Sequence, residues 1–177
     1  MRVMGLDLSL TGTGVALTDG STALIKTGSL RGCERLAHIR HEVTSLVFAP
    51  DGAMVHLVVI EDYAAHSPGN EAPKAELHGV ILLALYDWSI PVALVNPATL
   101  KKYATGKGTA KKEDMKLAAY KQFGREFPSN DECDAFFLRC MGLEATSGVL
   151  RRDHNTDAMR KARAEALTKV EWPEVGR

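Results

Sequence analysis

Short apolar runs bounded by turn residues predict five strands along the chain. The fourth run is apolar almost throughout, which is typical of a strand that is buried on both faces and parallel to a neighbour. We expect Gly12–Gly14 to turn the chain between the first two strands, and Asp19–Ser21 to form a hairpin turn after the second. The predicted strands cover residues 2–8, 15–18, 23–27, 54–60 and 91–95.

Between and after the strands, apolar residues recur at steps of three and four positions, as they do in amphipathic helices. The order of elements predicts an α/β fold, in which a mixed five-stranded sheet is flanked by helices. Its strands form a three-stranded antiparallel meander plus two parallel strands. Residues 149–177 are expected to be an added charged helix and a loose end. The predicted helices cover residues 31–48, 74–88, 110–123 and 131–145, with one or two helical turns over 97–103.

Four acidic residues occupy unusual positions in this scheme. Asp7 lies inside the first strand, Glu61 at the end of the fourth, and Asp131 and Asp134 at the start of the last core helix, where their spacing places them on one face. A buried carboxylate needs a partner, and converging carboxylates repel one another unless a cation joins them. Hard ions such as Mg²⁺ and Mn²⁺ prefer these oxygen ligands. The pattern predicts a metal site, with room for two ions that activate water and stabilise the leaving oxygen of a phosphodiester.

Each acid taken alone also has an ordinary structural interpretation. Asp7 could be a satisfied acid at a strand end, and Glu61 could mark the point where a strand meets solvent. Asp131 could be a first-turn acid that interacts with the helix dipole. Asp134 fits this less well, because the apolar "AFFL" follows it directly. The metal hypothesis therefore rests on the four acids together.

The formal net charge of the 177-residue chain is zero, but the charge is unevenly distributed. The segment from Lys101 to Arg125 carries eight basic residues against two acidic ones. A run of this kind is commonly a solvated helix face, whereas beside a metal cluster it favours contacts to DNA phosphates.

Cysteine spacing and hydropathy exclude several other classes. The three cysteines form no CxxC pair, which argues against a zinc site and favours reduced thiols. The start of the chain lacks a secretory signal pattern, and no run approaches the roughly 20 apolar residues that span a membrane. We expect a cytoplasmic protein with no membrane partner.

Four segments resemble, in their order along the chain, the motifs of the RuvC-type Holliday junction resolvases, which are ribonuclease H-like nucleases. The likeness covers about residues 1–145. The lysine segment is its most specific part, because Lys101 is followed at the family's spacing by Gly106, Gly108, Ala110 and Lys112. The four segments are "GLDLSLTGTGVAL", "VVIED", "NPATLKKYATGKGTAKKEDM" and "NDECDAFF".

The resemblance implies a metal-dependent DNA endonuclease domain over residues 1–148, followed by the extension at 149–177. It assigns the metal to Asp7, Glu61, Asp131 and Asp134, with two Mg²⁺ or Mn²⁺ ions per site, and a catalytic role to Lys112. It also implies branched DNA as substrate (four-way junction, fork or flap) and a homodimer formed through the helix at 74–88. The implied DNA contacts are Lys101, Lys102, Lys107, Lys111, Lys112, Tyr63 and His66.

Two departures from the family pattern change the expectations. Leu8-Ser9 replaces the family's Pro-Gly, a form associated with phage-like members, which would act in a host cytoplasm. Ala64 replaces an aromatic residue, so that Tyr63 and His66 are the candidates for its role. Two other functions stay open: a junction-binding protein without catalysis, and an ATP-handling protein of the actin and sugar-kinase type, for which the chain lacks a second half.

Overall fold

The computed structural model of the chain describes residues 1–48, 52–63, 71–147 and 156–175. Its five strands form one mixed sheet in the order β3-β2-β1-β4-β5. β2 pairs antiparallel with β1 and β3, whereas β4 lies parallel to β1 and β5 parallel to β4. The predicted meander plus two parallel strands is confirmed. The strands are β1 (Val3–Asp7), β2 (Gly12–Ala16), β3 (Thr22–Lys26), β4 (Leu57–Glu61) and β5 (Val92–Val95).

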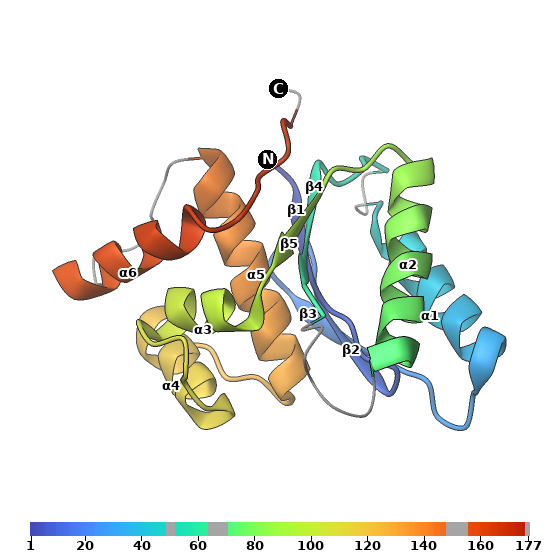
Figure 1. Cartoon of the computed structure of the whole chain (residues 1–177), viewed down its shortest axis with the longest axis horizontal. Helices are drawn as coiled ribbons and strands as arrows, with labels where there is room; N and C mark the ends of the chain where they lie inside the picture. Colours follow the sequence, from blue (N-terminus) through green and yellow to red (C-terminus); the bar gives the residue numbers. More distant parts are fainter. Residues whose placement is uncertain (49–51, 64–70, 148–155, 176–177) are drawn as a thin grey trace.

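Helices cover both faces of the sheet (Figure 1). α1 and α2 pack on one face, and α5 lies against β1, β2 and β4 on the other. α3 and α4 pack on α5, and α6 packs on α3. Within the described residues, no helix is long and apolar enough to cross a membrane. The helices are α1 (Gly32–Leu46), α2 (Glu71–Asp87), α3 (Pro97–Thr105), α4 (Lys112–Phe123), α5 (Asn130–Ser147) and α6 (Asp157–Leu167).

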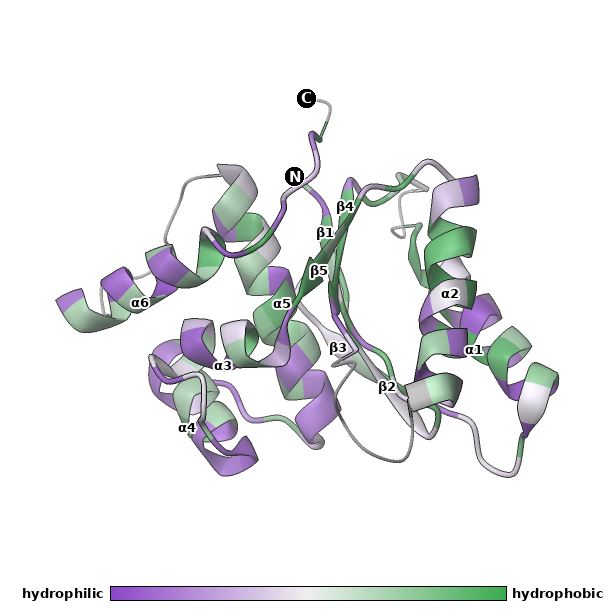
Figure 2. Cartoon of the chain, in the orientation of Figure 1, coloured by the Kyte–Doolittle hydropathy of each residue, from purple (hydrophilic) through white to green (hydrophobic). Residues whose placement is uncertain are grey.

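The apolar core is divided by the sheet into two halves, and the strand alternation decides which residue faces which half. Along β1, Val3 belongs to the half beneath α5, whereas Met4 and Leu6 belong to the half beneath α1 and α2. Figure 2 shows the hydrophobic residues along the central strands and many hydrophilic ones on α4 and α6. By the same alternation, Asp7 faces α5.

Glycines allow α5 to lie directly on the sheet. A Cβ atom on Gly5 would lie 2.7 Å from the backbone nitrogen of Arg139 and closer still to the carbonyl oxygen of Ala135. A Cβ atom on Gly14 would lie 2.9 Å from the backbone nitrogen of Glu132. The prediction that Gly12–Gly14 turns the chain was wrong, because both glycines are residues of β2. The small size of Gly14 serves the close approach of α5 rather than a turn.

The C-terminal residues are part of the packed structure. The predicted charged helix is present as α6, where the Arg163 side chain is 2% exposed. The expected loose end was wrong for the described residues after α6, because Trp172 packs against the core and its Nε1 donates a hydrogen bond to the carbonyl oxygen of Leu167 at 3.0 Å. The proposed boundary at residue 148 lies outside the described residues.

Candidate active site

Two of the predicted acids end neighbouring strands. In the parallel pair, Leu6 of β1 lies opposite Ile60 of β4, so that the next residues, Asp7 and Glu61, are neighbours at the carboxyl ends of these strands. Leu57 and Val59, which share the face of Glu61 along β4, belong to the core beneath α5. Both carboxylates therefore lie on the face of the sheet that α5 covers.

The first two turns of α5 bring the other two acids to this place. Ser129 precedes the helix, and its hydroxyl accepts a hydrogen bond from the backbone N–H of Glu132 at 3.1 Å, which caps the helix start. The buried Glu132 side chain accepts hydrogen bonds from Ser129 and from Thr22 of β3, and it thus ties the helix start to the sheet. Asp131 and Asp134 lie on the side of the helix that faces the strand ends, and a carboxylate oxygen of Asp131 lies 3.6 Å from where a Cβ on Gly12 would be.

Burial and mutual repulsion raise the pKa values of three of these acids. Burial raises the pKa of Asp7 well above its usual value, and the charges of Glu61, Asp134 and Asp131 raise it further. Burial and the charge of Asp134 raise the pKa of Glu61 to about 7. Burial raises the pKa of Asp134 to about 6, with a further contribution from Asp131. The sequence-predicted acids thus form one interacting group, the acid cluster, defined as Asp7, Glu61, Asp131 and Asp134.

Three lysines from different helices act electrostatically on the acid cluster. Lys101 of α3 and Lys112 at the start of α4 both lower the pKa values of Glu61 and Asp134. Lys74 of α2 lowers those of Asp7 and Glu61. Lys101 and Lys112 were predicted at the site, whereas Lys74 was missed. It belongs to none of the recognised motifs, and only the fold brings the start of α2 near the strand ends.

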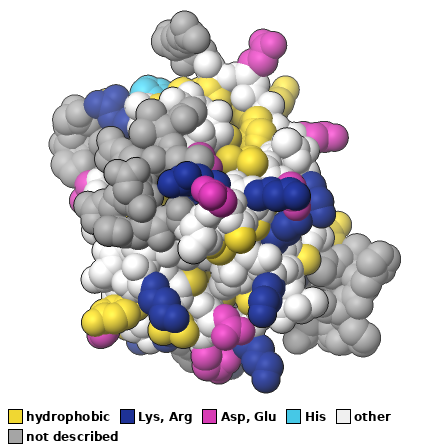
Figure 3. Space-filling model, turned by 90° about the vertical axis from the view of Figure 1, so that its left-hand side faces the viewer, with side chains coloured by type: hydrophobic (Ala, Val, Ile, Leu, Met, Phe, Trp, Pro, Cys, Tyr) yellow, Lys and Arg dark blue, Asp and Glu magenta, His cyan; other side chains and the backbone are white. Residues whose placement is uncertain are grey.

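The other predicted DNA-contacting residues divide into three groups. Lys107 and Lys111 are exposed, and Figure 3 shows that the face formed by α3, α4 and α6 carries Lys and Arg side chains interspersed with acidic ones. Lys102 forms an ion pair with Glu165 of α6. Tyr63 is partly exposed beside the buried His78, with ring centroids 5.3 Å apart, and His66 lies outside the described residues.

The donor chemistry of the acid cluster fits a hard divalent cation. Four carboxylates supply only oxygen ligands, and burial together with mutual repulsion raises the pKa values of Asp7, Glu61 and Asp134, which is a repulsion that a cation would relieve. As they stand, no three or more His, Cys, Asp or Glu side chains in the described part of the chain are arranged so that they could hold a metal ion. The acid cluster is therefore a candidate metal site because its carboxylates interact with one another, and not because the structure shows a complete set of metal ligands.

The raised pKa values predict how the metal-free protein responds to pH. The folded state binds protons at Glu61 and Asp134 more tightly than the unfolded chain does. Proton binding at these two acids therefore stabilises the fold, and this contribution is fully present below the pKa values that the acids have in the unfolded chain. It is lost as the pH rises through about 6 for Asp134 and about 7 for Glu61. We expect the Tm in EDTA to fall between about pH 5 and about pH 8, and Mg²⁺ to raise it more at the higher pH.

Thermal unfolding followed by circular dichroism measures this effect, and Glu61→Gln provides the comparison. The variant lacks one titrating acid, so its Tm in EDTA should decline less over the same pH range. A wild-type Tm that is flat or rising over this range, or a Mg²⁺ effect that is equal at both ends, would contradict the interaction of these acids.

Comparison with known proteins agrees with this architecture. No protein-family model matches the chain. A RuvC structure from Thermus thermophilus superimposes with a TM-score of 0.66 at 22% identity, covering 84% of this chain and 97% of that one. A second structure, of T. thermophilus RuvC in complex with a Holliday junction substrate, gives a TM-score of 0.64 at 22% identity, covering 78% of this chain and 90% of the other. The expected ribonuclease H-like fold is confirmed.

Relatives identified by sequence carry the same family name. A crossover junction endodeoxyribonuclease RuvC from Xanthobacter autotrophicus is 25% identical over 175 residues, covering 93% of this chain and 96% of the relative. One from Salinispora arenicola is 32% identical over 127 residues, covering 65% of this chain and 70% of the relative. With this identity, coverage and shared fold, the chain belongs to the RuvC family of crossover junction endodeoxyribonucleases.

Proposed function

We propose that the protein is a divalent-metal-dependent endonuclease that cleaves phosphodiesters in branched DNA, with the Holliday junction as the foremost substrate. The observation that carries this proposal is the meeting of Asp7 and Glu61, at the ends of two strands, with Asp131 and Asp134 in the first two turns of α5. The substrate is supported by the relatives' names and by the T. thermophilus RuvC that was solved with a Holliday junction. Such an enzyme would act in the cytoplasm, which is the host cytoplasm if the protein is phage-encoded.

The acid cluster would hold Mg²⁺ or Mn²⁺, two ions per site. Bound ions of this kind supply an activated water and stabilise the leaving oxygen. The chain keeps the four carboxylates in a partly buried place, which strengthens their attraction for a cation. Lys112 and Lys101 add positive charge beside Glu61 and Asp134, where it can stabilise the negative charge that develops on the phosphate.

The exposed lysines of the basic segment suit contacts to the DNA backbone. Lys107 and Lys111 lie in the loop that joins α3 to α4, next to Lys112, and would position the strand by phosphate contacts without reading sequence. Tyr63 follows β4 by two residues, near the same end of the sheet, and is 38% exposed. It is our candidate for contact with an unpaired or unstacked base.

We also propose a homodimer formed through α2. On this helix Leu83 is 61% exposed and Tyr86 is 79% exposed, three residues apart and hence on one face. Two large apolar side chains exposed on one helix face favour an interaction surface there. A two-fold dimer uses the same face on both subunits and places two sites symmetrically, which suits paired cuts on a four-way junction.

Replacing Tyr86 with Glu is expected to convert the dimer to a monomer, because two copies would bring two carboxylates into an apolar interface. Sedimentation velocity measures the change, and Tyr120→Glu on α4 is the matched control, since Tyr120 is also exposed but lies on another helix. If wild type is a monomer at micromolar concentration, or if Tyr86→Glu stays dimeric, α2 is not the dimer surface.

Cleavage of labelled DNA of different shapes tests the proposed function. Four-way junction, fork, flap and plain duplex are incubated with the protein in Mg²⁺ and in Mn²⁺. We expect cleavage of branched forms and little cleavage of duplex. Binding of the junction with no cleavage in either metal would instead favour the non-catalytic junction binder. The described residues form one sheet, and not the two similar halves that the ATP-handling alternative requires.

A further inference from the structure

α6 is fixed to the rest of the molecule by a buried arginine. The guanidinium of Arg163 lies 4.8 Å from the ring centroid of Tyr103 in α3, and it donates a hydrogen bond to the side-chain oxygen of Gln122 in α4. The Tyr103 hydroxyl in turn donates to a carboxylate oxygen of Glu144 in α5 at 2.7 Å. Arg163 is 2% exposed, so these contacts are shielded from water. The position of α6 against α3 is therefore set by its core contacts.

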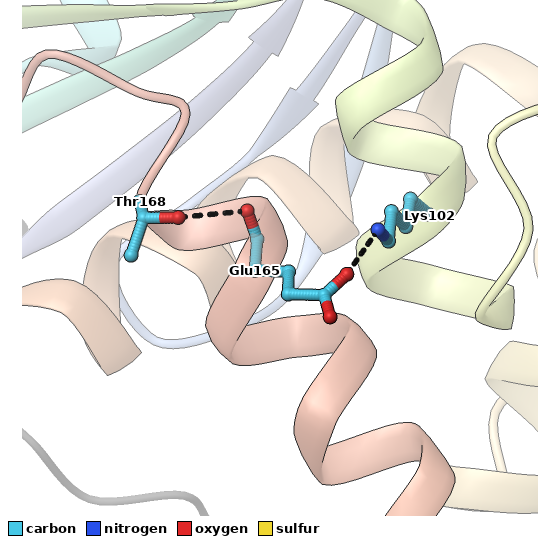
Figure 4. Close-up of polar contacts among 3 residues, drawn as sticks. All are labelled: Lys102, Glu165 and Thr168. Carbon is cyan, nitrogen blue, oxygen red and sulfur yellow. Dashed lines mark hydrogen bonds and ion pairs between the residues drawn. The ribbon is translucent and has the colours of Figure 1, made fainter.

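This anchoring places Glu165 beside a lysine of the basic segment. Figure 4 shows the Lys102 ammonium of α3 directed at the Glu165 carboxylate, to which it donates a hydrogen bond. The Thr168 hydroxyl donates to the backbone carbonyl of Glu165 at 3.0 Å, in the last turn of the same helix. The Lys102 side chain is 25% exposed. Two free surface side chains pay an entropic cost to pair, which is smaller when both helices are already held together.

The pair changes what the basic segment offers to DNA. Lys101 acts on the acid cluster, whereas Lys102, one residue further around α3, faces α6. A lysine that is paired with a carboxylate cannot neutralise a phosphate without leaving its partner. The carboxylate also repels a nearby phosphate. Glu165 thus makes the Lys102 ammonium unavailable for contact with the DNA backbone.

We propose that Glu165 is a residue that limits the protein's affinity for DNA, by holding Lys102 away from backbone phosphates. This inference rests on the proposed function, because it assumes that the basic segment binds DNA. Phosphate contacts are the same in every duplex, so restraining one of them weakens binding to plain duplex DNA without touching the acid cluster. The protein then depends more on the contacts that only a branched substrate can provide.

Salt-dependent binding tests the proposal. Affinities for duplex and for four-way junction DNA are measured by fluorescence anisotropy without divalent metal, so that the DNA stays intact. Glu165→Gln should tighten duplex binding by roughly threefold to tenfold at low salt. It should also steepen the plot of log affinity against log salt by about 0.9, which is the change expected when Lys102 forms one additional phosphate contact. Glu165→Ala should do the same, and Tm values show that both variants fold.

Two further variants separate this effect from a general change of charge. Glu171→Gln removes the same charge just beyond α6, and because Glu171 is exposed and forms no ion pair among the described residues, this variant should leave the salt slope unchanged. Lys102→Met should alter duplex binding little in the wild-type background and should abolish the gain in the Glu165→Gln background.

The outcomes distinguish this inference from the proposed function. If Glu165→Gln binds duplex as wild type does, or if its gain persists together with Lys102→Met, Glu165 does not restrain Lys102. If Glu171→Gln gives an equal gain, the effect is one of net charge, and the inference is also overturned. If wild type binds neither DNA, the proposed function fails first and this inference fails with it.

Discussion

Replacing Asp7 with Asn is expected to lower the rate of junction cleavage by about 10³-fold or more, while junction binding stays close to that of wild type. The asparagine has nearly the same shape, but it removes a negative charge from the acid cluster that would bind the ions. Several kcal/mol of charge stabilisation by bound metal correspond to this loss of rate. Single-turnover cleavage of a labelled junction in Mg²⁺ measures it.

The same substitution is expected to stabilise the metal-free protein at neutral pH. The pKa of Asp7 is raised by burial and by the charges of Glu61, Asp134 and Asp131, so its ionised form is unfavourable in the fold. Asn removes this repulsion. Asp62→Asn serves as the control, because Asp62 lies just outside β4 and is not part of the acid cluster. Asp7→Asn that keeps more than about a tenth of wild-type cleavage would show that Asp7 is not a ligand of an essential ion.

Replacing Gly5 with Ala is expected to lower the free energy of unfolding by about 3 kcal/mol or more, at the upper end of what overpacking costs. The new methyl group would meet the backbone of α5 at Ala135 and Arg139, and backbone atoms of a helix cannot move aside singly. α5 would have to shift as a unit. Since Asp131 and Asp134 lie in its first two turns, cleavage should be lost even where the protein still folds.

Urea unfolding measures the stability of Gly5→Ala, and Gly79→Ala is a matched control. Gly79 lies within α2, and a Cβ atom there would have nothing within 4 Å. That substitution should be neutral or stabilising, because Ala is the better helix former by about 1 kcal/mol. Equal stability of Gly5→Ala and wild type would mean that α5 does not lie as close to β1 as the structure shows.

The acid cluster could be predicted from sequence because its members stand at recognisable points of regular elements. An acid in an apolar strand, an acid at a strand end and two acids one helical turn apart are local patterns, and the order of the elements brings them to one edge of the sheet. The parallel pairing of β1 and β4 then makes Asp7 and Glu61 neighbours. The assignment of these acids as metal ligands stays a prediction.

Features that depend on contacts between distant segments could not be predicted in the same way. Gly12 and Gly14 looked like a turn but are strand residues, and the packing of α5 explains the lack of a side chain at Gly14. Lys74 belongs to no motif, and Lys102 looked like a free cation until α6 placed Glu165 beside it. In each case the residue that explains the feature belongs to a different helix or strand.

The metal dependence of cleavage tests the central claim most directly, namely that the acid cluster binds divalent ions and uses them to cut branched DNA. Single-turnover cleavage of a four-way junction is measured across a Mg²⁺ titration, with wild type and Glu61→Gln side by side and junction binding recorded for both. We predict saturable Mg²⁺ dependence for wild type and no cleavage by Glu61→Gln at any Mg²⁺ concentration, although the variant still binds the junction. Cleavage by wild type in EDTA, or undiminished cleavage by Glu61→Gln, would contradict the claim.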